Sequence, residues 1–436
     1  MIALPWGAVL VLVFIAIFFF IFLGMPVAVV LGLVGTLSSF LFLNKMGIVA
    51  YASWQVCNSF ILSAVPLFVF MGHLLLTSGL SDRLYEGGSA LMGRLKGGLL
   101  HVNIFCCALF ASTSGSSVAG AATIGSMAIP QMEKRGYDKK ITFGSLAAGG
   151  TLGLIIPPSN AMIIYCVVVD ESVSDLFMAG IMPGLMLVLL YMLYIWARVK
   201  ISPHLAPPME EKYTTRQILI KVFRIWPVLL IMVTILGGIY AGVTTPTEAA
   251  AMGACLALIS GIVSRNLTWK RLTETLIDSV KTTSQLLFIM IGASIISGTF
   301  GLLHIPDLMA SWVISLGVSR VLVLLIIYIM YSMLGCFIDT VSMMVMTLPV
   351  IFPLVTSLGY DPIWFGIIVV LLVEMAMITP PVGLNVYVIH SLRPNESITS
   401  VFRGSLPFFL VMFLGVILLT IFPTIATWLP STMKFH

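Results

Sequence analysis

Long apolar stretches separated by short polar loops make up almost the whole chain. A helix needs roughly 20 apolar residues to cross the hydrocarbon core of a bilayer, and most of the stretches reach about that length. We therefore predict an all-α, polytopic integral membrane protein. The apolar stretches lie at about 5–23, 26–43, 55–77, 99–130, 141–169, 176–198, 225–243, 246–263, 282–303, 308–319, 321–357, 363–390 and 405–430.

Composition agrees with this pattern, because 59% of the residues are hydrophobic and only 9% are charged. The net charge of +5 does not indicate nucleic-acid binding, since the basic residues lie in short loops and form no basic face. By the positive-inside rule the Lys- and Arg-rich loops are cytoplasmic, and both termini are then outside. These loops are 79–98, 131–140, 198–224, 264–281 and 391–403.

Two stretches, 99–130 and 321–357, are too long and too interrupted for one span each. The topology predicted from the charges is self-consistent only if each of these two stretches enters and leaves the membrane by the same face, as a re-entrant hairpin. Their polar, glycine-containing tips lie at 112–117 and 335–340. Because non-helical backbone at membrane depth must be covered by protein or line a wet cavity, we expect both tips to line a site.

The chain also repeats itself. Gly136-Tyr137-Asp138 recurs as Gly359-Tyr360-Asp361, and Pro157-Pro158 recurs as Pro380-Pro381 at the same distance from the aspartate. The loop is basic after the first copy (Lys139-Lys140) but not after the second, which indicates that the two copies have opposite orientations. Inverted repeats with interrupted helices are typical of secondary transporters.

We therefore predict two inverted repeats, 1–220 and 221–436. Each begins with scaffold helices, at about 1–98 and 221–303. A hairpin and a broken helix follow, at about 99–170 and 308–390. A Pro-Pro break frees backbone carbonyls one turn earlier, and carbonyl and hydroxyl oxygens can hold a dehydrated Na⁺. One cation site per half follows, although prolines and glycines also kink or pack transmembrane helices without any such role.

The motifs together resemble those of the large membrane subunit of tripartite ATP-independent periplasmic (TRAP) transporters. The matching stretches are Ala111–Pro130, Gly136–Asp138, Ala148–Asn160, Gly335–Pro353 and Thr379–Asn385. The resemblance implies a multi-pass protein of a bacterial or archaeal cytoplasmic membrane, and an elevator-type carrier rather than an enzyme. It also implies at least two Na⁺ sites, with neither a transition metal nor an organic cofactor.

The same resemblance implies partners and a substrate class. A periplasmic substrate-binding protein delivers a small organic anion, either a carboxylate such as a C4-dicarboxylate, a sialic acid or another sugar acid, or a sulfonate. A four-helix small membrane subunit is expected as a separate chain, because no four extra helices precede Pro5.

Carried over residue by residue, the resemblance gives two sodium sites and one substrate site. The first sodium site is expected at Ser114, Gly153, Ile156 and Pro157, and the second at Gly335, Ala376, Thr379 and Val382. The substrate is expected between the tips, near Ser116, Ser117, Asn160, Asp339, Thr340 and Asn385.

Ionisable residues within the apolar zone are functional candidates by default. Asp339 lies in the second tip, and Glu374 precedes the second Pro-Pro break, where it could neutralise a cation. Glu248 beside Thr245 has the spacing of a helix cap, and we expect His73 to be a packed residue. The stretches 79–98 and 264–281 are predicted as amphipathic arms in the membrane interface.

Two other functions compete with this interpretation. A stand-alone divalent-anion/sodium symporter shares the plan of inverted hairpins, but such carriers tend to carry Ser-Asn-Thr at both tips, where this chain has Ser-Gly-Ser and Ile-Asp-Thr. An intramembrane hydrolase is suggested only by Thr113-Ser114-Gly115, and it would not need two inverted copies.

Overall fold

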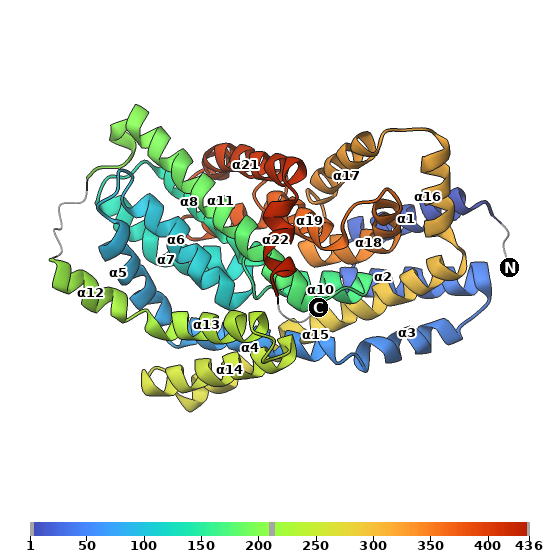
Figure 1. Cartoon of the computed structure of the whole chain (residues 1–436), viewed down its shortest axis with the longest axis horizontal. Helices are drawn as coiled ribbons and strands as arrows, with labels where there is room; N and C mark the ends of the chain where they lie inside the picture. Colours follow the sequence, from blue (N-terminus) through green and yellow to red (C-terminus); the bar gives the residue numbers. More distant parts are fainter. Residues whose placement is uncertain (1–3, 209–213, 434–436) are drawn as a thin grey trace.

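The computed structural model describes residues 4–208 and 214–433, and every regular element within them is a helix (Figure 1). The side chains of residues 111–113, in the first tip, lie outside the described part. The prediction of an all-α fold is confirmed for the described residues. Up to residue 208 the helices are α1 (Trp6–Phe22), α2 (Val27–Ser38), α3 (Gly47–Cys57), α4 (Ala64–Thr77), α5 (Leu80–Met92), α6 (Leu99–Ser114), α7 (Ser117–Lys134), α8 (Lys139–Gly150), α9 (Leu152–Ile155), α10 (Asn160–Val169) and α11 (Val173–Ile201).

From residue 214 onward the helices continue in the same manner, with α15 the longest of them. They are α12 (Thr215–Phe223), α13 (Trp226–Tyr240), α14 (Pro246–Val263), α15 (Trp269–Leu302), α16 (Ile305–Ser315), α17 (Arg320–Leu334), α18 (Thr340–Ser357), α19 (Pro362–Ala376), α20 (Leu384–Ser391), α21 (Ile398–Ile421) and α22 (Thr424–Ser431). The predicted repeat boundary at 220/221 falls inside α12, and the division into two inverted repeats stays a prediction.

The thirteen apolar stretches of the sequence do not correspond to thirteen uninterrupted membrane-spanning helices among the described residues. Five of them, α11, α14, α15, α18 and α21, are individually long and apolar enough to cross a membrane. Three further candidates are pairs of helices bent by more than 40° at a short break. Others, including α6, α17 and α19, are apolar but only 10 to 17 residues long over their apolar part. Half-length helices of this kind are what hairpins and broken spans require.

Three of the predicted segments have different bounds in the structure. The stretch 55–77 is divided between α3 and α4, which meet at an angle of 55°; Pro66 in the first turn of α4 lacks the N–H that a continuous helix needs. Residues 269–281 of the arm predicted at 264–281 form the first part of α15, because no Gly or Pro interrupts the chain between Trp269 and Met290. The stretch 405–430 is divided between α21 and α22.

The recurring Gly-Tyr-Asp motif has a local structural reason. Gly136 and Gly359 both have positive φ, of 72° and 81°, which glycine adopts at little cost. The aspartate that follows each of them caps the next helix: Asp138 accepts a hydrogen bond from the Ile141 N–H, and Asp361 accepts one from the Trp364 N–H. The motif therefore reverses the chain and starts α8 and α19.

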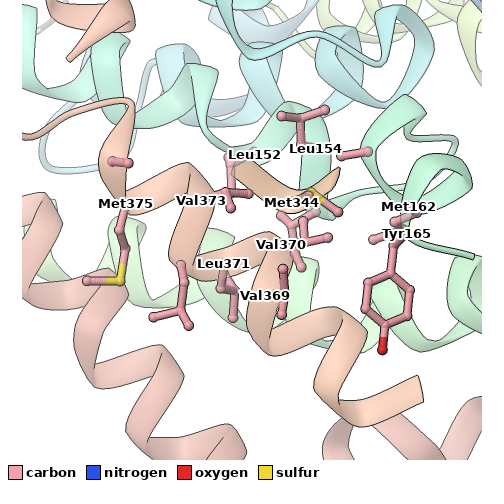
Figure 2. Packing of buried hydrophobic residues seen from close by; sticks show 14 of the residues in the cluster. Leu152, Leu154, Met162, Tyr165, Met344, Val369, Val370, Leu371, Val373 and Met375 are labelled. Carbon is pink, nitrogen blue, oxygen red and sulfur yellow. The ribbon is translucent and has the colours of Figure 1, made fainter. Parts of the chain in front are cut away.

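Two of these helices form the centre of the hairpin-bearing region. All residues of α8 from Ile141 to Gly150, and of α19 from Trp364 to Ala376, are buried. Figure 2 shows Val373 of α19 beside Leu152 of α9, two helices that pack on each other. A helix that is apolar on every side is buried on every side. The helices α2, α4, α13, α14 and α15 pack mainly on one another along one side of the molecule (Figure 1).

Candidate functional site

The first hairpin tip lies against the first broken helix. The chain turns at Gly115, with φ 58°, and Ser116 caps α7 by accepting a hydrogen bond from the Ala119 N–H. A Cβ atom added to Gly115 would lie 3.4 Å from both the Pro158 carbonyl oxygen and Asn160 Nδ2. The tip therefore rests directly on the break between α9 and α10.

On its other side this tip contacts α4 of the helix group around α14 and α15. A Cβ atom added to Gly72 would lie 2.8 Å from the Ser114 carbonyl oxygen, so only glycine permits this approach. Of the four residues predicted for the first sodium site, Ser114, Gly153 and Pro157 are buried and Ile156 is half-buried. The packing of α6 on α9 brings the tip and the broken helix together.

The second tip lies against the second broken helix. A Cβ atom added to Gly335 would lie 2.0 Å from Ala376 Cβ, a distance that no side chain could occupy. Cys336 Sγ donates a hydrogen bond to the Pro380 carbonyl oxygen at 3.2 Å. The tip beyond them ends at Asp339, which caps α18 by accepting a hydrogen bond from the Ser342 N–H at 3.1 Å.

The residues predicted for the second sodium site lie close together. Gly335, Ala376 and Val382 line one pocket of about 220 Å³, together with Asp339. The hydroxyl of Thr379 donates to the Ala376 carbonyl oxygen at 3.2 Å, in the irregular segment between α19 and α20. Backbone carbonyls and one hydroxyl are hard oxygen donors that suit an alkali cation. Both Pro157-Pro158 and Pro380-Pro381 are cis peptides.

The six residues predicted for the substrate fall into separate groups. Ser116 and Asn160 flank the first tip, and the buried Oδ1 of Asn160 has no hydrogen-bond partner in the described structure. Asp339 and Thr340 belong to the second tip, where the Thr340 hydroxyl points to Met377 Sδ at 3.4 Å.

The other two members of that set, Ser117 and Asn385, are fully buried and hydrogen-bonded within the protein. Ser117 Oγ donates to Glu374 Oε1 at 2.5 Å, and Asn385 Nδ2 donates to the Ala147 carbonyl oxygen at 3.1 Å. Both bonds join the first half of the chain to the second. Whether they also contact substrate stays a prediction.

The structure adds to what the sequence indicates for two residues. The sequence marks Glu374 as a residue that could neutralise a cation, because it is a carboxylate in an apolar helix. Its side chain is fully buried and hydrogen-bonded across the two halves. Nothing in the sequence singles out Gly150. A Cβ atom there would lie 2.9 Å from both Asn385 Nδ2 and the Ser117 carbonyl oxygen, which only the tertiary structure reveals.

Two other polar residues have structural roles, as predicted. Glu248 completes a capping box with Thr245, accepting hydrogen bonds from its N–H and hydroxyl at 2.8 and 2.9 Å. His73 Nδ1 is 2.9 Å from Ser279 Oγ, which joins α4 to α15.

Ion pairs hold together two loops that the charge pattern predicted on one face. Arg393 binds Glu133 with two nitrogens, at 2.9 to 3.1 Å, and Lys139 binds Glu396 at 2.5 Å. Elsewhere between the two halves, Tyr165 OH of α10 donates to the Pro362 carbonyl oxygen at the start of α19 at 2.7 Å.

An apolar all-helical fold in which two hairpin tips meet two broken helices defines a secondary membrane transporter. Comparison with known protein families agrees: the family described as "Tripartite ATP-independent periplasmic transporter, DctM component" matches residues 14–425. The chain belongs to this family, a family of cytoplasmic-membrane transporter permeases rather than of enzymes, and is one component of a tripartite system.

Named relatives and a solved structure extend this result. The chain is 36% identical to the C4-dicarboxylate TRAP transporter large permease protein DctM of Pseudomonas aeruginosa, covering 92% of this chain and 93% of the relative. It is 32% identical to the isethionate TRAP transporter permease protein DctMQ of Oleidesulfovibrio alaskensis, covering 95% of this chain and 64% of the relative. The crystal structure of the Alcanivorax borkumensis YdaH transporter has a similar fold, with a TM-score of 0.59 at 16% identity over 91% of this chain and 90% of that one.

Proposed function

We propose that this chain imports a small organic anion together with Na⁺, in a complex with a substrate-binding protein. The observation that carries the proposal is the duplicated contact of a hairpin tip with a broken helix, at Gly115 on Pro158 and at Gly335 on Ala376. Each contact brings irregular backbone and hydroxyl oxygens together inside an apolar protein. Two sodium sites, one at each contact, follow from that chemistry.

An anionic substrate is favoured by the helices that begin at the tips. The N-termini of α7 and α18 start at Ser117 and Thr340, so their first N–H groups face the region next to the two tips. Helix N-termini attract anions through these N–H groups and the helix dipole. Among the described residues, the lining of the pocket at the second tip includes Asp339 and neither Lys nor Arg, so bound Na⁺ would supply the remaining positive charge.

The relatives indicate which anions to test. One relative is named for C4-dicarboxylates and another for isethionate, a sulfonate. Both ligands are small and carry one or two acidic groups that are ionised at neutral pH. We propose the same class for this chain, a small carboxylate or sulfonate.

An elevator mechanism is supported by how the helices group. The α2, α4, α13, α14 and α15 helices pack mainly with one another. The first hairpin (α6 and α7) packs mainly on α5, α8 and α9, and the second (α17 and α18) on α10, α16 and α19, with α6 touching α4 and α18 touching α15. In this proposal the first group of helices is the scaffold, and the hairpins with the broken helices are the moving unit. Between them lies a pocket of about 360 Å³, lined by Asn58 and Ser294 on one side and by Val168 and Val345 on the other. In the proposed cycle, the loaded hairpin unit slides past this scaffold.

The complex would contain two further proteins. The family is the DctM component of a tripartite periplasmic transporter, so a periplasmic substrate-binding protein and a small four-helix membrane subunit are the proposed partners. The DctMQ relative is longer than this chain, which covers 64% of it.

Uptake into proteoliposomes tests the proposal. Vesicles containing this chain and its small subunit would be given a labelled C4-dicarboxylate, sialic acid or sulfonate, with or without the binding protein. An inward Na⁺ gradient would be compared with an equal K⁺ gradient. We expect uptake only with both Na⁺ and the binding protein. Uptake that does not require the binding protein would instead identify a stand-alone symporter. Uptake that is the same with the Na⁺ and the K⁺ gradient would refute the sodium coupling.

A further inference from the structure

A buried hydrogen bond connects the first hairpin tip with the second broken helix. Ser117 is the first residue of α7, and its hydroxyl donates to Glu374 Oε1 of α19 at 2.5 Å. The residues are 2% and 0% exposed. The other carboxyl oxygen of Glu374 is buried without a partner in the described structure. Among the described residues, the bond from Ser117 is therefore the only hydrogen bond to a carboxyl group deep inside the protein.

The two residues also stand next to the two proposed cation sites. Ser117 is three residues from Ser114, a residue of the first site, across the turn at Gly115, and Glu374 lies two residues before Ala376, a residue of the second. Ala376 in turn touches Gly335 at the second tip. A continuous path of contacts thus runs from one cation site to the other through the Ser117–Glu374 bond.

A second contact stabilises the same junction. Asn385 follows the second Pro-Pro break and donates to the Ala147 carbonyl oxygen of α8 at 3.1 Å. Gly150 lies between the two bonds, because a Cβ atom there would be 2.9 Å from both Asn385 Nδ2 and the Ser117 carbonyl oxygen. The glycine lets α8, α20 and the tip approach closely enough for both bonds to form.

We propose that Ser117 and Glu374 form a latch that couples the two cation sites, with Glu374 as a positioning residue. Separating the pair would leave a buried carboxyl group without its partner, which is costly in an apolar interior. Ion binding at the first site orders the first tip, and through the latch it orders α19 at the second site. Coupling between sites is reciprocal, so each Na⁺ raises the affinity for the other. This inference rests on the proposed sodium coupling.

Conservative variants separate the latch from general packing. Glu374→Gln keeps the shape and an oxygen acceptor for Ser117, whereas Glu374→Leu removes the acceptor. Ser117→Ala removes the donor, and Gly150→Ala forces the junction apart. Matched controls are Ser126→Ala, an exposed serine of α7 that bonds only within its own helix, and Gly301→Ala, where an added Cβ has open space.

The measurement is initial uptake against Na⁺ concentration, with folded protein quantified by size-exclusion chromatography. We expect a Hill coefficient above 1 for the parent chain, Glu374→Gln and both controls. For Glu374→Leu, Ser117→Ala and Gly150→Ala we expect a Hill coefficient near 1 and a half-saturating Na⁺ concentration at least about five-fold higher, as for loss of a typical coupling.

The other possible outcomes distinguish failure of the latch from failure of the proposed function. If uptake by the parent chain does not depend on Na⁺, the proposed function is refuted, and the latch with it. A Na⁺-dependent parent whose latch variants lose only maximal rate, with an unchanged Hill coefficient, would show that the bond merely supports the fold. Loss of cooperativity in Glu374→Gln as well as Glu374→Leu would also overturn the latch, because the hydrogen bond would then not be the coupling element. If Glu374→Leu fails to fold, Ser117→Ala decides by the same criteria.

Discussion

At the scale of single residues, glycine is required where a tip meets a broken helix. Gly335 has no room for any side chain, because its Cβ position is 2.0 Å from Ala376 Cβ. Gly301 near the end of α15 has no atom within 4 Å of its Cβ position. The same residue type is therefore obligatory at one position and replaceable at the other.

We expect Gly335→Ala to reduce Na⁺-dependent uptake by more than about ten-fold, because overpacking by one methyl group costs about 1–3 kcal/mol and the cost falls on the second cation site. Proteoliposome uptake and the half-saturating Na⁺ concentration measure the effect. Gly301→Ala is the control and should transport normally. Normal uptake by Gly335→Ala would mean that this tip contact is not part of the transport site.

Asp339 combines a structural and a proposed functional role. Its carboxylate caps α18 through the Ser342 N–H, and its side chain lines the pocket at the second tip. Asparagine caps helices about as well as aspartate, whereas alanine costs about 1 kcal/mol. Substitution by asparagine therefore removes the charge while keeping the cap.

We expect Asp339→Asn to retain the thermal stability of the parent chain but to lose most of its uptake, and Asp339→Ala to lose both. Thermal unfolding of the purified protein and uptake at saturating Na⁺ provide the two readouts. If Asp339→Asn transports like the parent, Asp339 acts only as a helix cap.

At the scale of secondary-structure elements, α8 and α21 cross in direct backbone contact. A Cβ atom on Gly144 would lie 2.0 Å from the Gly404 carbonyl oxygen, and one on Gly404 would lie 2.0 Å from the Lys140 carbonyl oxygen. Small residues at helix crossings are the usual means of close packing in membranes, where lipid gives no hydrophobic drive for helix association. This crossing fixes α8, and therefore the first broken helix, against the second half.

We expect Gly404→Ala to lower the thermal unfolding temperature and the yield of monodisperse protein, because neither backbone can move without breaking the crossing. Gly415→Ala, on the same helix α21, is the matched control, since its nearest neighbours are side-chain atoms at 3.7 Å or more. Equal unfolding temperatures for the two variants would contradict the assigned crossing. Thermal unfolding monitored in detergent is sufficient.

At the scale of the whole molecule, polar contacts join the two halves at several depths. Ion pairs join Glu133 to the loop at Arg393. Ser117 and Asn385 join the first tip and α8 to the second broken helix. Tyr165 joins α10 to the start of α19. The exposed ion pairs are worth at most about 1 kcal/mol each. The hairpin unit is consequently expected to move as one body.

The predicted orientation can be tested on intact cells. Lys45 and Lys134 are both exposed, and the charge pattern predicts Lys45 outside and Lys134 in the cytoplasm. We expect Lys45→Cys, but not Lys134→Cys, to react with a membrane-impermeant maleimide before the cells are opened. The parent chain, which contains the exposed Cys57 and Cys255, gives the background. The reverse labelling pattern would invert the assigned topology.

The sequence alone determined the all-helical membrane class, the two hairpins with their turns near Gly115 and Gly335, and the positions of both Pro-Pro breaks. It could do so because apolar runs, glycines and prolines act through the local backbone, where no distant partner is needed. It misjudged the elbow between α3 and α4 and the length of α15, since packing decides whether a short interruption bends a helix or is absorbed.

Only the tertiary structure decided which residues meet. The pairing of Ser117 with Glu374, and of Asn385 with Ala147, joins positions more than two hundred residues apart. Gly150 and Gly404 look like any other helical glycine until the helix that crosses them is known. Contacts of this kind depend on the relative placement of whole helices, which no local pattern encodes, and they connect the two proposed cation sites into one unit.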